Sequence, residues 1–149
     1  MPVFAESISG RVVAVADGDT LTLLDRSFVE HKIRLSGIDA PEKKQAFGQR
    51  AKATMADNVY GLPAEADCRI TDRYGRNICV VRVNGRDVGL EQIRAGMAWW
   101  YRQYAKDQTP REQLDYENAE GQAKSARRGL WSDKDPLPPW EWRRASKNF

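Results

Sequence analysis

Histidine and cysteine are scarce in this chain of 149 residues, which has one His and two Cys. The scarcity excludes a zinc module built on four cysteines, a metalloprotease of the H-E-x-x-H type and a metal centre with several histidines. No apolar run approaches the roughly 20 residues that a membrane-spanning helix needs, so no membrane partner is expected. The chemistry of the protein therefore has to use carboxylates, guanidinium groups and hydroxyls.

Charge of one sign is not in large excess either. The chain has 24 Lys+Arg against 21 Asp+Glu, a net charge of +3. Binding of nucleic acid through charge alone requires a much larger excess, so the composition permits a nucleic-acid partner without indicating one. Hydrophobic residues make up 41% and charged residues 30%, as expected of a folded domain, and the length suits one domain rather than two.

The first residues bear on the cellular location of the protein. Residues 1–6 lack the basic segment and apolar core of an intact signal peptide. Val3-Phe4-Ala5 nevertheless resembles the residues before a signal-peptidase cleavage site, which favours a secreted or periplasmic protein whose signal peptide has been removed. An irregular N-terminus of a cytosolic protein explains the same residues equally well.

The first half of the chain has the pattern of β-strands. From Ile8 to Ser36, β-rich apolar residues are separated by turn residues, and Asp17-Gly18 predicts a tight turn between the first two strands. A second hairpin is predicted over residues 67–83 around a turn at 72–75, and Asn84-Gly85 then reverses the chain.

The two cysteines fall on the two arms of the second hairpin. A hairpin folded symmetrically about Arg73 and Tyr74 places Cys68 opposite Cys79, within reach of a disulfide. Export favours a bridge, whereas a cytosolic location leaves two small buried hydrophobic side chains. We expect the bridge.

Helices are predicted in three places. Apolar residues repeat every fourth position over 47–59, and Gly61 follows as a helix stop. A short helix is expected over 90–95, ended by Gly96. The third helix has the clearest signals and is described next.

Thr109 is a candidate N-cap, Pro110 fits the first helical position and Glu112 completes a capping box. An apolar stripe continues to Leu130, and Gly129 marks the expected end of the helix. The Pro/Trp-rich residues 133–149 are expected to run as an extended tail behind a core of about residues 8–132. Five strands and three helices in a single domain, 1–149, predict an α+β fold, a small β-barrel with packed helices.

Four acidic residues fall at predicted strand ends or turns: Asp17, Asp19, Asp39 and Glu42. Acids at turn tips can converge on one cation, and hard oxygen ligands suit Ca²⁺ or Mg²⁺. An irregular loop that mixes carboxylate and carbonyl oxygens suits the larger Ca²⁺. Taken singly, each of these motifs is more often an ordinary turn or the start of a helix.

Four motifs in order are more specific than any one of them: DGDT at 17–20, IRL at 33–35, GIDAPE at 37–42 and TDRYGR at 71–76. Together they resemble the staphylococcal nuclease family. The likeness runs from about Ser9 to Trp131 and includes GMA at 96–98 and GLWS at 129–132. The resemblance implies a five-stranded OB-fold barrel with three helices and a Ca²⁺-dependent phosphodiesterase site.

The resemblance also implies roles for single residues. Asp19 and Asp39 match carboxylate ligands of calcium, and Ala40 matches a position that lends its backbone carbonyl. Asp17 matches a nearby acid with a secondary part. The other three roles belong to the reaction itself: Glu42 matches the acid that handles the attacking water, and Arg34 and Arg76 match the two guanidinium groups that hold the phosphate.

Three departures from the family pattern concern the substrate. The segment from Glu42 to Phe47 is shorter than the flexible loop of the best-known member, and Arg73 replaces a lysine before Tyr74. Of two tyrosines expected at the nucleotide pocket, Tyr104 fits one place, whereas the other holds Arg102, with Tyr101 one residue away. We expect Arg73, Tyr74 and Tyr104 to contact substrate.

The resulting hypothesis is a Ca²⁺-dependent endonuclease that hydrolyses DNA and RNA to products with 3′-phosphate ends. We expect a monomer that needs no obligate protein partner. The alternative is a non-catalytic OB-fold module that binds nucleic acid or a protein. Retention of the whole charged set favours catalysis, because a binding module does not need it.

Overall fold

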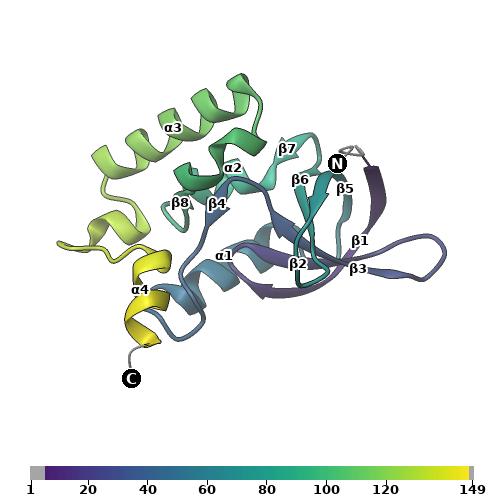
Figure 1. The fold of residues 1–149 in the computed structure, drawn as a ribbon, viewed down its shortest axis with the longest axis horizontal. Helices are drawn as coiled ribbons and strands as arrows, with labels where there is room; N and C mark the ends of the chain where they lie inside the picture. Colours follow the sequence, from purple (N-terminus) through teal and green to yellow (C-terminus); the bar gives the residue numbers. More distant parts are fainter. Residues whose placement is uncertain (1–5, 148–149) are drawn as a thin grey trace.

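The computed structural model describes residues 6–147, in which a curled sheet is flanked by helices (Figure 1). Five strands build a barrel: β1 (Glu6–Asp17), β2 (Thr20–Leu24), β3 (Glu30–Leu35), β5 (Pro63–Thr71) and β6 (Asn77–Val83). They pair antiparallel in the order β3-β2-β1-β5-β6, and a parallel pairing of β3 with β6 closes the barrel. The α+β fold class with a five-stranded barrel is thus confirmed.

Three short strands extend this framework. β4 (Ile38–Asp39) pairs with β8 (Trp99–Trp100), and β7 (Arg86–Asp87) pairs with the end of β6. The predicted turn at Asn84-Gly85 joins β6 to β7 with positive φ at both residues, 54° and 76°. Such a conformation suits Asn and Gly better than other residues.

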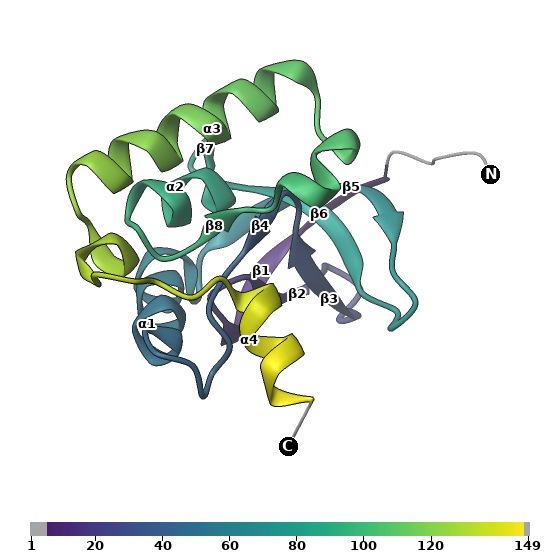
Figure 2. The ribbon, with the colours of Figure 1, turned by 60° about the vertical axis from the view of Figure 1, so that its left-hand side comes forward.

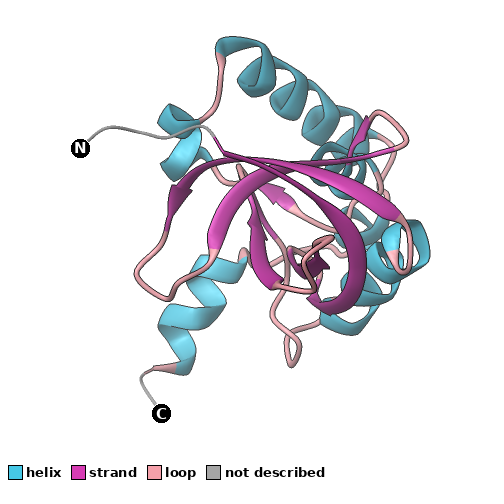
Figure 3. Ribbon diagram, turned by 90° about the vertical axis from the view of Figure 1, so that its right-hand side faces the viewer, coloured by secondary structure: helices cyan, strands magenta, loops and turns pink. Residues whose placement is uncertain are grey.

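The helices lie around the barrel (Figures 2 and 3). They are α1 (Gly48–Val59), α2 (Val88–Arg94), α3 (Pro110–Ser125) and α4 (Pro139–Ser146), with the 3₁₀ helices η1 (Arg102–Asp107) and η2 (Gly129–Ser132). The stripe predicted on the first helix is buried, with Ala51, Met55 and Val59 each at most 1% exposed. Among residues 6–147, no helix is long and apolar enough to cross a membrane.

The start of α3 agrees with the prediction and its end does not. Thr109 and Glu112 form the capping box, with Pro110 in the first turn. The helix ends at Ser125, because the chain turns through Arg127 with φ 53°. Gly129 is not the helix stop that the sequence indicated. Its backbone lies against Gly96 too closely to admit a Cβ.

The prediction that residues 133–149 run extended is wrong for 139–146, which form α4. Pro138 is the N-cap and Pro139 occupies the first turn. An amide hydrogen is not needed in the first turn and the fixed φ of proline suits it, so these prolines start a helix rather than prevent one.

Cys68 and Cys79 are paired opposite each other on β5 and β6, with their Cα atoms 4.0 Å apart, and are joined by a disulfide. A register shift follows between Cys68 and Ile70. The bridge therefore ties the two arms of the hairpin below the turn at 72–75. The suggested cleavage motif at 3–5 lies outside the described residues.

Candidate active site

Two buried aspartates from separate segments lie side by side. Asp19 is in the β1–β2 turn, where its N–H donates to Asp17 Oδ1 at 3.0 Å. Asp39 ends β4. The N–H of the next residue, Ala40, donates to Asp19 Oδ2 at 2.8 Å, which fastens the turn to the segment after β4. Asp19 is 6% exposed and Asp39 1%, so neither charge is well hydrated.

A residue that the sequence did not indicate as functional, Gln92, holds the β1–β2 turn in place. The buried Gln92 of α2 donates its side-chain amide to the carbonyl oxygens of Gly18, at 2.9 Å, and Ala51, at 3.1 Å. A Cβ on Gly18 would lie 2.7 Å from Ala51 Cβ and 2.8 Å from Ala40 Cβ. Only glycine therefore lets the turn sit this deep.

Arg34 places its guanidinium between the two aspartates. It lies on β3, paired in register with Thr20 beside the turn. Its Nη2 is 3.5 Å from Asp19 Oδ2 and 3.4 Å from Asp39 Oδ1, and its Nη1 donates to the Leu35 carbonyl at 2.9 Å. The site thus assembles Asp19, Arg34 and Asp39 from three strands or turns.

Burial and neighbouring charges shift the pKa values of the three aspartates in different directions. Burial, together with the negative charge of Asp19, raises the pKa of Asp17 to about 7. Burial also acts to raise the pKa of Asp19, but the charge of Arg34 and several hydrogen bonds outweigh it, and that pKa is lowered. For Asp39 burial dominates over Arg143 and Arg34, and the pKa is raised. The site contains more buried negative charge than Arg34 alone can balance.

Glu42 and Asp39 share a further partner, Arg143 of α4, which the sequence analysis did not identify. Arg143 Nη2 donates to Asp39 Oδ2 at 2.7 Å, and Nη1 donates to Asp39 Oδ1 at 3.1 Å and to Glu42 Oε1 at 2.7 Å. The hydrogen bonds to Asp39, followed by those to Glu42, raise the pKa of Arg143. No signal in the sequence connects this arginine with acids about a hundred positions earlier.

Arg76 forms an ion pair within its own turn. Its Nε donates to Asp72 Oδ2 at 2.8 Å in the β5–β6 turn, and it makes no ion pair with Asp19 or Asp39. The parallel pairing of Arg34 with Ile78 nevertheless places Arg76 two residues before the partner of Arg34. Arg76 thus lies just ahead of β6, beside the start of the strand that pairs with β3.

The other proposed substrate residues are accessible. Tyr74 is 69% exposed at the tip of the hairpin, with the guanidinium groups of Arg73 and Arg76 at 5.0 Å and 5.6 Å from its ring centre. Tyr104 is 47% exposed and meets Tyr101 edge-on at 4.8 Å. Arg73, Tyr74 and Tyr104 make no hydrogen bond or ion pair with Asp17, Asp19, Asp39 or Glu42.

The donor chemistry fits a hard divalent cation. Asp19 and Asp39 present carboxylates within reach of one guanidinium, and the hydroxyl of Thr20 lies 3.0 Å from Asp19 Oδ1. Within residues 6–147, no three His, Cys, Asp or Glu side chains form a group able to hold a metal ion. A cation here would therefore need ligands besides carboxylates, such as a backbone carbonyl or water.

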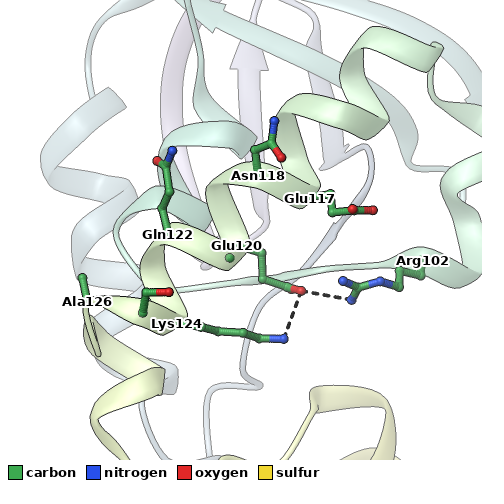
Figure 4. Close-up of a pocket in the computed structure, with 9 residues that line it drawn as sticks. Arg102, Glu117, Asn118, Glu120, Gln122, Lys124 and Ala126 are labelled. Carbon is green, nitrogen blue, oxygen red and sulfur yellow. Dashed lines mark ion pairs between the residues drawn. The ribbon is translucent and has the colours of Figure 1, made fainter.

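A separate hollow between α3 and Arg102 contains none of the acids or arginines of the site (Figure 4). The buried Glu120 lies there between Arg102, at 3.0 Å, and Lys124, at 3.3 Å, and accepts a hydrogen bond from the Trp100 N–H at 2.7 Å. Trp100 belongs to β8, the partner of β4. Glu120 thus anchors β8 to α3, and with it the pairing of β8 with β4, the strand that contains Asp39.

Comparison with known proteins settles the family. The family described as staphylococcal nuclease homologue matches residues 32–133. The chain belongs to the staphylococcal nuclease family.

Several relatives align with almost the whole chain of this staphylococcal nuclease family member. A micrococcal nuclease of Shigella flexneri is 40% identical over 99% of this chain and 87% of its own length. An uncharacterized endonuclease of Haemophilus influenzae is 42% identical over 92% of this chain and 74% of its own. Protein ParB of Escherichia coli is 41% identical over 99% and 85%, respectively. The relatives named as micrococcal nuclease and endonuclease support a nuclease.

Proposed function

We propose that this chain is a Ca²⁺-dependent endonuclease that hydrolyses DNA and RNA and leaves 3′-phosphate ends. The observation that carries the proposal is the cluster of Asp19, Arg34 and Asp39, in which two buried carboxylates and one guanidinium from different segments converge within 3.5 Å. The relatives named as endonuclease and micrococcal nuclease support the same reaction class.

Asp19, Asp39 and the carbonyl of Ala40 would hold the Ca²⁺, with Asp17 in support. When bound there, a divalent cation supplies a Lewis acid for a phosphate oxygen and a positive charge for the attacking water. The buried carboxylates favour such a cation because they lie where water cannot screen them.

Arg34 and Arg76 serve the phosphate. A guanidinium offers paired N–H donors that match two phosphate oxygens, and these bonds strengthen as negative charge builds up in the transition state. Arg34 is already beside the acids. Arg76 exchanges the carboxylate of Asp72 for the phosphate of the substrate, an anion-for-anion exchange at the same donor.

Glu42 accepts the proton of the attacking water or fixes the direction of that water. Its Oε1 is taken by Arg143, whereas Oε2 has no hydrogen-bond partner among the described residues. Arg73 and Tyr74 line the path of the nucleic-acid backbone, and Tyr104 stacks on a base.

The proposal extends to the setting of the protein. A disulfide between Cys68 and Cys79 is typical of an oxidising compartment, which supports a secreted or periplasmic protein. We propose that the whole chain, 1–149, acts as one nuclease domain and as a monomer.

The test is incubation of purified protein with 5′-labelled single-stranded DNA or RNA, in Ca²⁺ or in EGTA, followed by phosphatase treatment of the products. Cleavage in Ca²⁺ alone, with ends that lose a 3′-phosphate, is expected. Asp19→Asn should abolish it, and Asp57→Asn, the same change at an exposed position of α1, should not. Binding of DNA without cleavage in any cation would instead identify a non-catalytic OB-fold module.

A further inference from the structure

Helix α4 covers the acids of the site, and its contacts resemble those of a ligand. Arg143 uses both terminal nitrogens of its guanidinium on Asp39, at 2.7 Å and 3.1 Å, and one of them also on Glu42, at 2.7 Å. Figure 2 shows α4 beside the segment that leads from β4 to α1. The family match ends at residue 133, so this helix lies beyond the part of the chain that defines the family.

A cation at Asp39 needs the same lone pairs as Arg143. Both carboxylate oxygens of Asp39 already accept hydrogen bonds from Arg143, and Oδ1 also faces Arg34. A carboxylate that is shared by two guanidinium groups is a weak ligand for a third positive charge, because the cations repel one another. Arg143 and a divalent cation would therefore compete for Asp39.

A second contact places α4 over the aromatic side of the site. The ring of Trp140 lies parallel to the ring of Tyr101, with an interplanar angle of 9° and centres 5.2 Å apart. Tyr101 in turn meets Tyr104 edge-on. Stacking on a tyrosine face is the contact that a nucleobase would make, so Trp140 occupies a place suited to a base.

Few side chains attach α4 to the rest of the protein. In α4 only Pro139 is buried, Trp140 and Arg143 are half-buried, and the last residues of the helix are exposed. Ahead of the helix, Gln45 Nε2 donates to the Leu137 carbonyl at 2.7 Å. A helix of eight residues is not stable alone in water, so α4 depends on these few contacts.

We propose that α4 is a built-in competitive cap of the nuclease site, in which Arg143 competes with the divalent cation for Asp39 and Glu42 and Trp140 competes with a base for Tyr101. This inference rests on the proposed function. Cation binding detaches Arg143 and, with it, the helix, so the cap sets the cation concentration at which the site becomes available. By linkage, the population of the docked cap lowers the apparent affinity for the cation.

The test is calorimetric titration of Ca²⁺ into the wild-type chain and two matched variants, without nucleic acid. Arg143→Ala removes the competing guanidinium, and Arg144→Ala removes the same charge from the exposed neighbouring position of α4. We expect Arg143→Ala to bind Ca²⁺ at least about fivefold more tightly than Arg144→Ala, the lower end of typical coupling between two ligands of one protein. Melting curves of both variants check that each is folded.

A second readout follows the helix itself. In ¹⁵N NMR spectra the indole signal of Trp140, assigned with Trp140→Phe, should shift when Ca²⁺ is added to the wild type. In Arg143→Ala it should lie near the Ca²⁺-bound position before Ca²⁺ is added. An indole signal that Ca²⁺ leaves unmoved in the wild type would overturn the cap.

The outcomes separate the two proposals. Equal Ca²⁺ affinity of the Arg143 and Arg144 variants, with Ca²⁺-dependent cleavage intact, would overturn the cap and leave the nuclease proposal standing. Weaker Ca²⁺ binding by Arg143→Ala would also overturn it, because Arg143 would then support the site. Absence of Ca²⁺ binding and of cleavage in every variant would overturn both.

Discussion

Arg34 of β3 lies against Asp39 of β4, with Nη2 3.4 Å from Oδ1. The same Nη2 is 3.5 Å from Asp19 Oδ2. One guanidinium thus faces two buried carboxylates. The arrangement places a paired donor beside the acids proposed to hold the cation, where it can reach a phosphate bound to that cation.

Arg34→Lys keeps the charge between the aspartates but loses the paired donors. We expect cleavage of single-stranded DNA to fall by about 10²–10³, as is typical when one such donor is lost. The fold should persist, because the carboxylates keep a positive neighbour. Lys32→Ala, at an exposed position of the same strand, is the control, and its turnover should be normal. Near-normal turnover of Arg34→Lys would remove Arg34 from the reaction.

Glu42→Gln removes the proton acceptor and keeps the shape of the side chain. The loss of turnover should be about 10²–10⁴ if Glu42 acts as a general base. Stability should change little, since the side chain is about one-third exposed (34%). Single-turnover cleavage with saturating Ca²⁺ separates this loss from weaker cation binding. A variant as fast as the wild type would contradict the role.

Gln92→Leu should loosen the turn of Asp19. The variant leaves the carbonyl oxygens of Gly18 and Ala51 without their buried donor, which costs about 1–3 kcal/mol for each such unpaired group. We expect a lower free energy of unfolding in urea and weaker Ca²⁺ binding. Gln122→Leu makes the same change at an exposed position of α3 and should alter neither quantity.

Glu112 gives a pH dependence of stability. It accepts hydrogen bonds from both terminal nitrogens of Arg69 at 2.8 Å. Burial acts to raise the pKa of Glu112, but Arg69 and the Thr109 N–H prevail and lower it below the ordinary 4.5. A lowered folded-state pKa means that the stabilisation is present above about pH 4.5 and is lost as the pH falls through the folded pKa.

Glu112→Gln should therefore lower the free energy of unfolding by about 1.5–3 kcal/mol at pH 7, the range for hydrogen bonds to charged groups. The difference from the wild type should shrink steadily below pH 4.5. Urea unfolding at a series of pH values measures it. A difference that grows on acidification would show that the pair is not what stabilises the helix start.

The bridge between Cys68 and Cys79 predicts that neither thiol reacts with a maleimide in denaturant until the protein is reduced. Replacing both cysteines by alanine should lower the free energy of unfolding by about 2–3 kcal/mol, as for a short closed loop. Mass spectrometry counts the labels. Two labels before reduction would exclude the bridge.

The sequence allowed prediction of the parts that local patterns define. The turn at Asp17-Gly18, the opposed cysteines and the capping box at Thr109 each follow from residues close together in the chain. Arg34 could be placed near the acids because the four ordered motifs resemble those of the staphylococcal nuclease family. A small barrel followed from the number of strands and helices in a short chain, and its five-stranded OB form from the same resemblance.

Other parts depend on contacts that no local pattern reports. Arg143 reaches Asp39 across most of the chain, and prolines that usually interrupt helices here begin one. Gln92 carries no signal, because a buried glutamine looks like any polar helix residue until its carbonyl partners are known. The role of Arg76 depends on whether its guanidinium binds Asp72 or a phosphate, and the spacing of the motifs does not distinguish these two anions.

The parallel pairing of β3 with β6 has a consequence for folding. Residues 33–35 pair with 77–79 only when the barrel closes, whereas the hairpins on either side, β2–β3 and β5–β6, can form from nearby residues. Joining distant segments is slow, because the intervening chain must first lose conformational entropy. During refolding, cleavage should thus return only after strand content has largely recovered, since no fragment containing a single hairpin possesses the complete site.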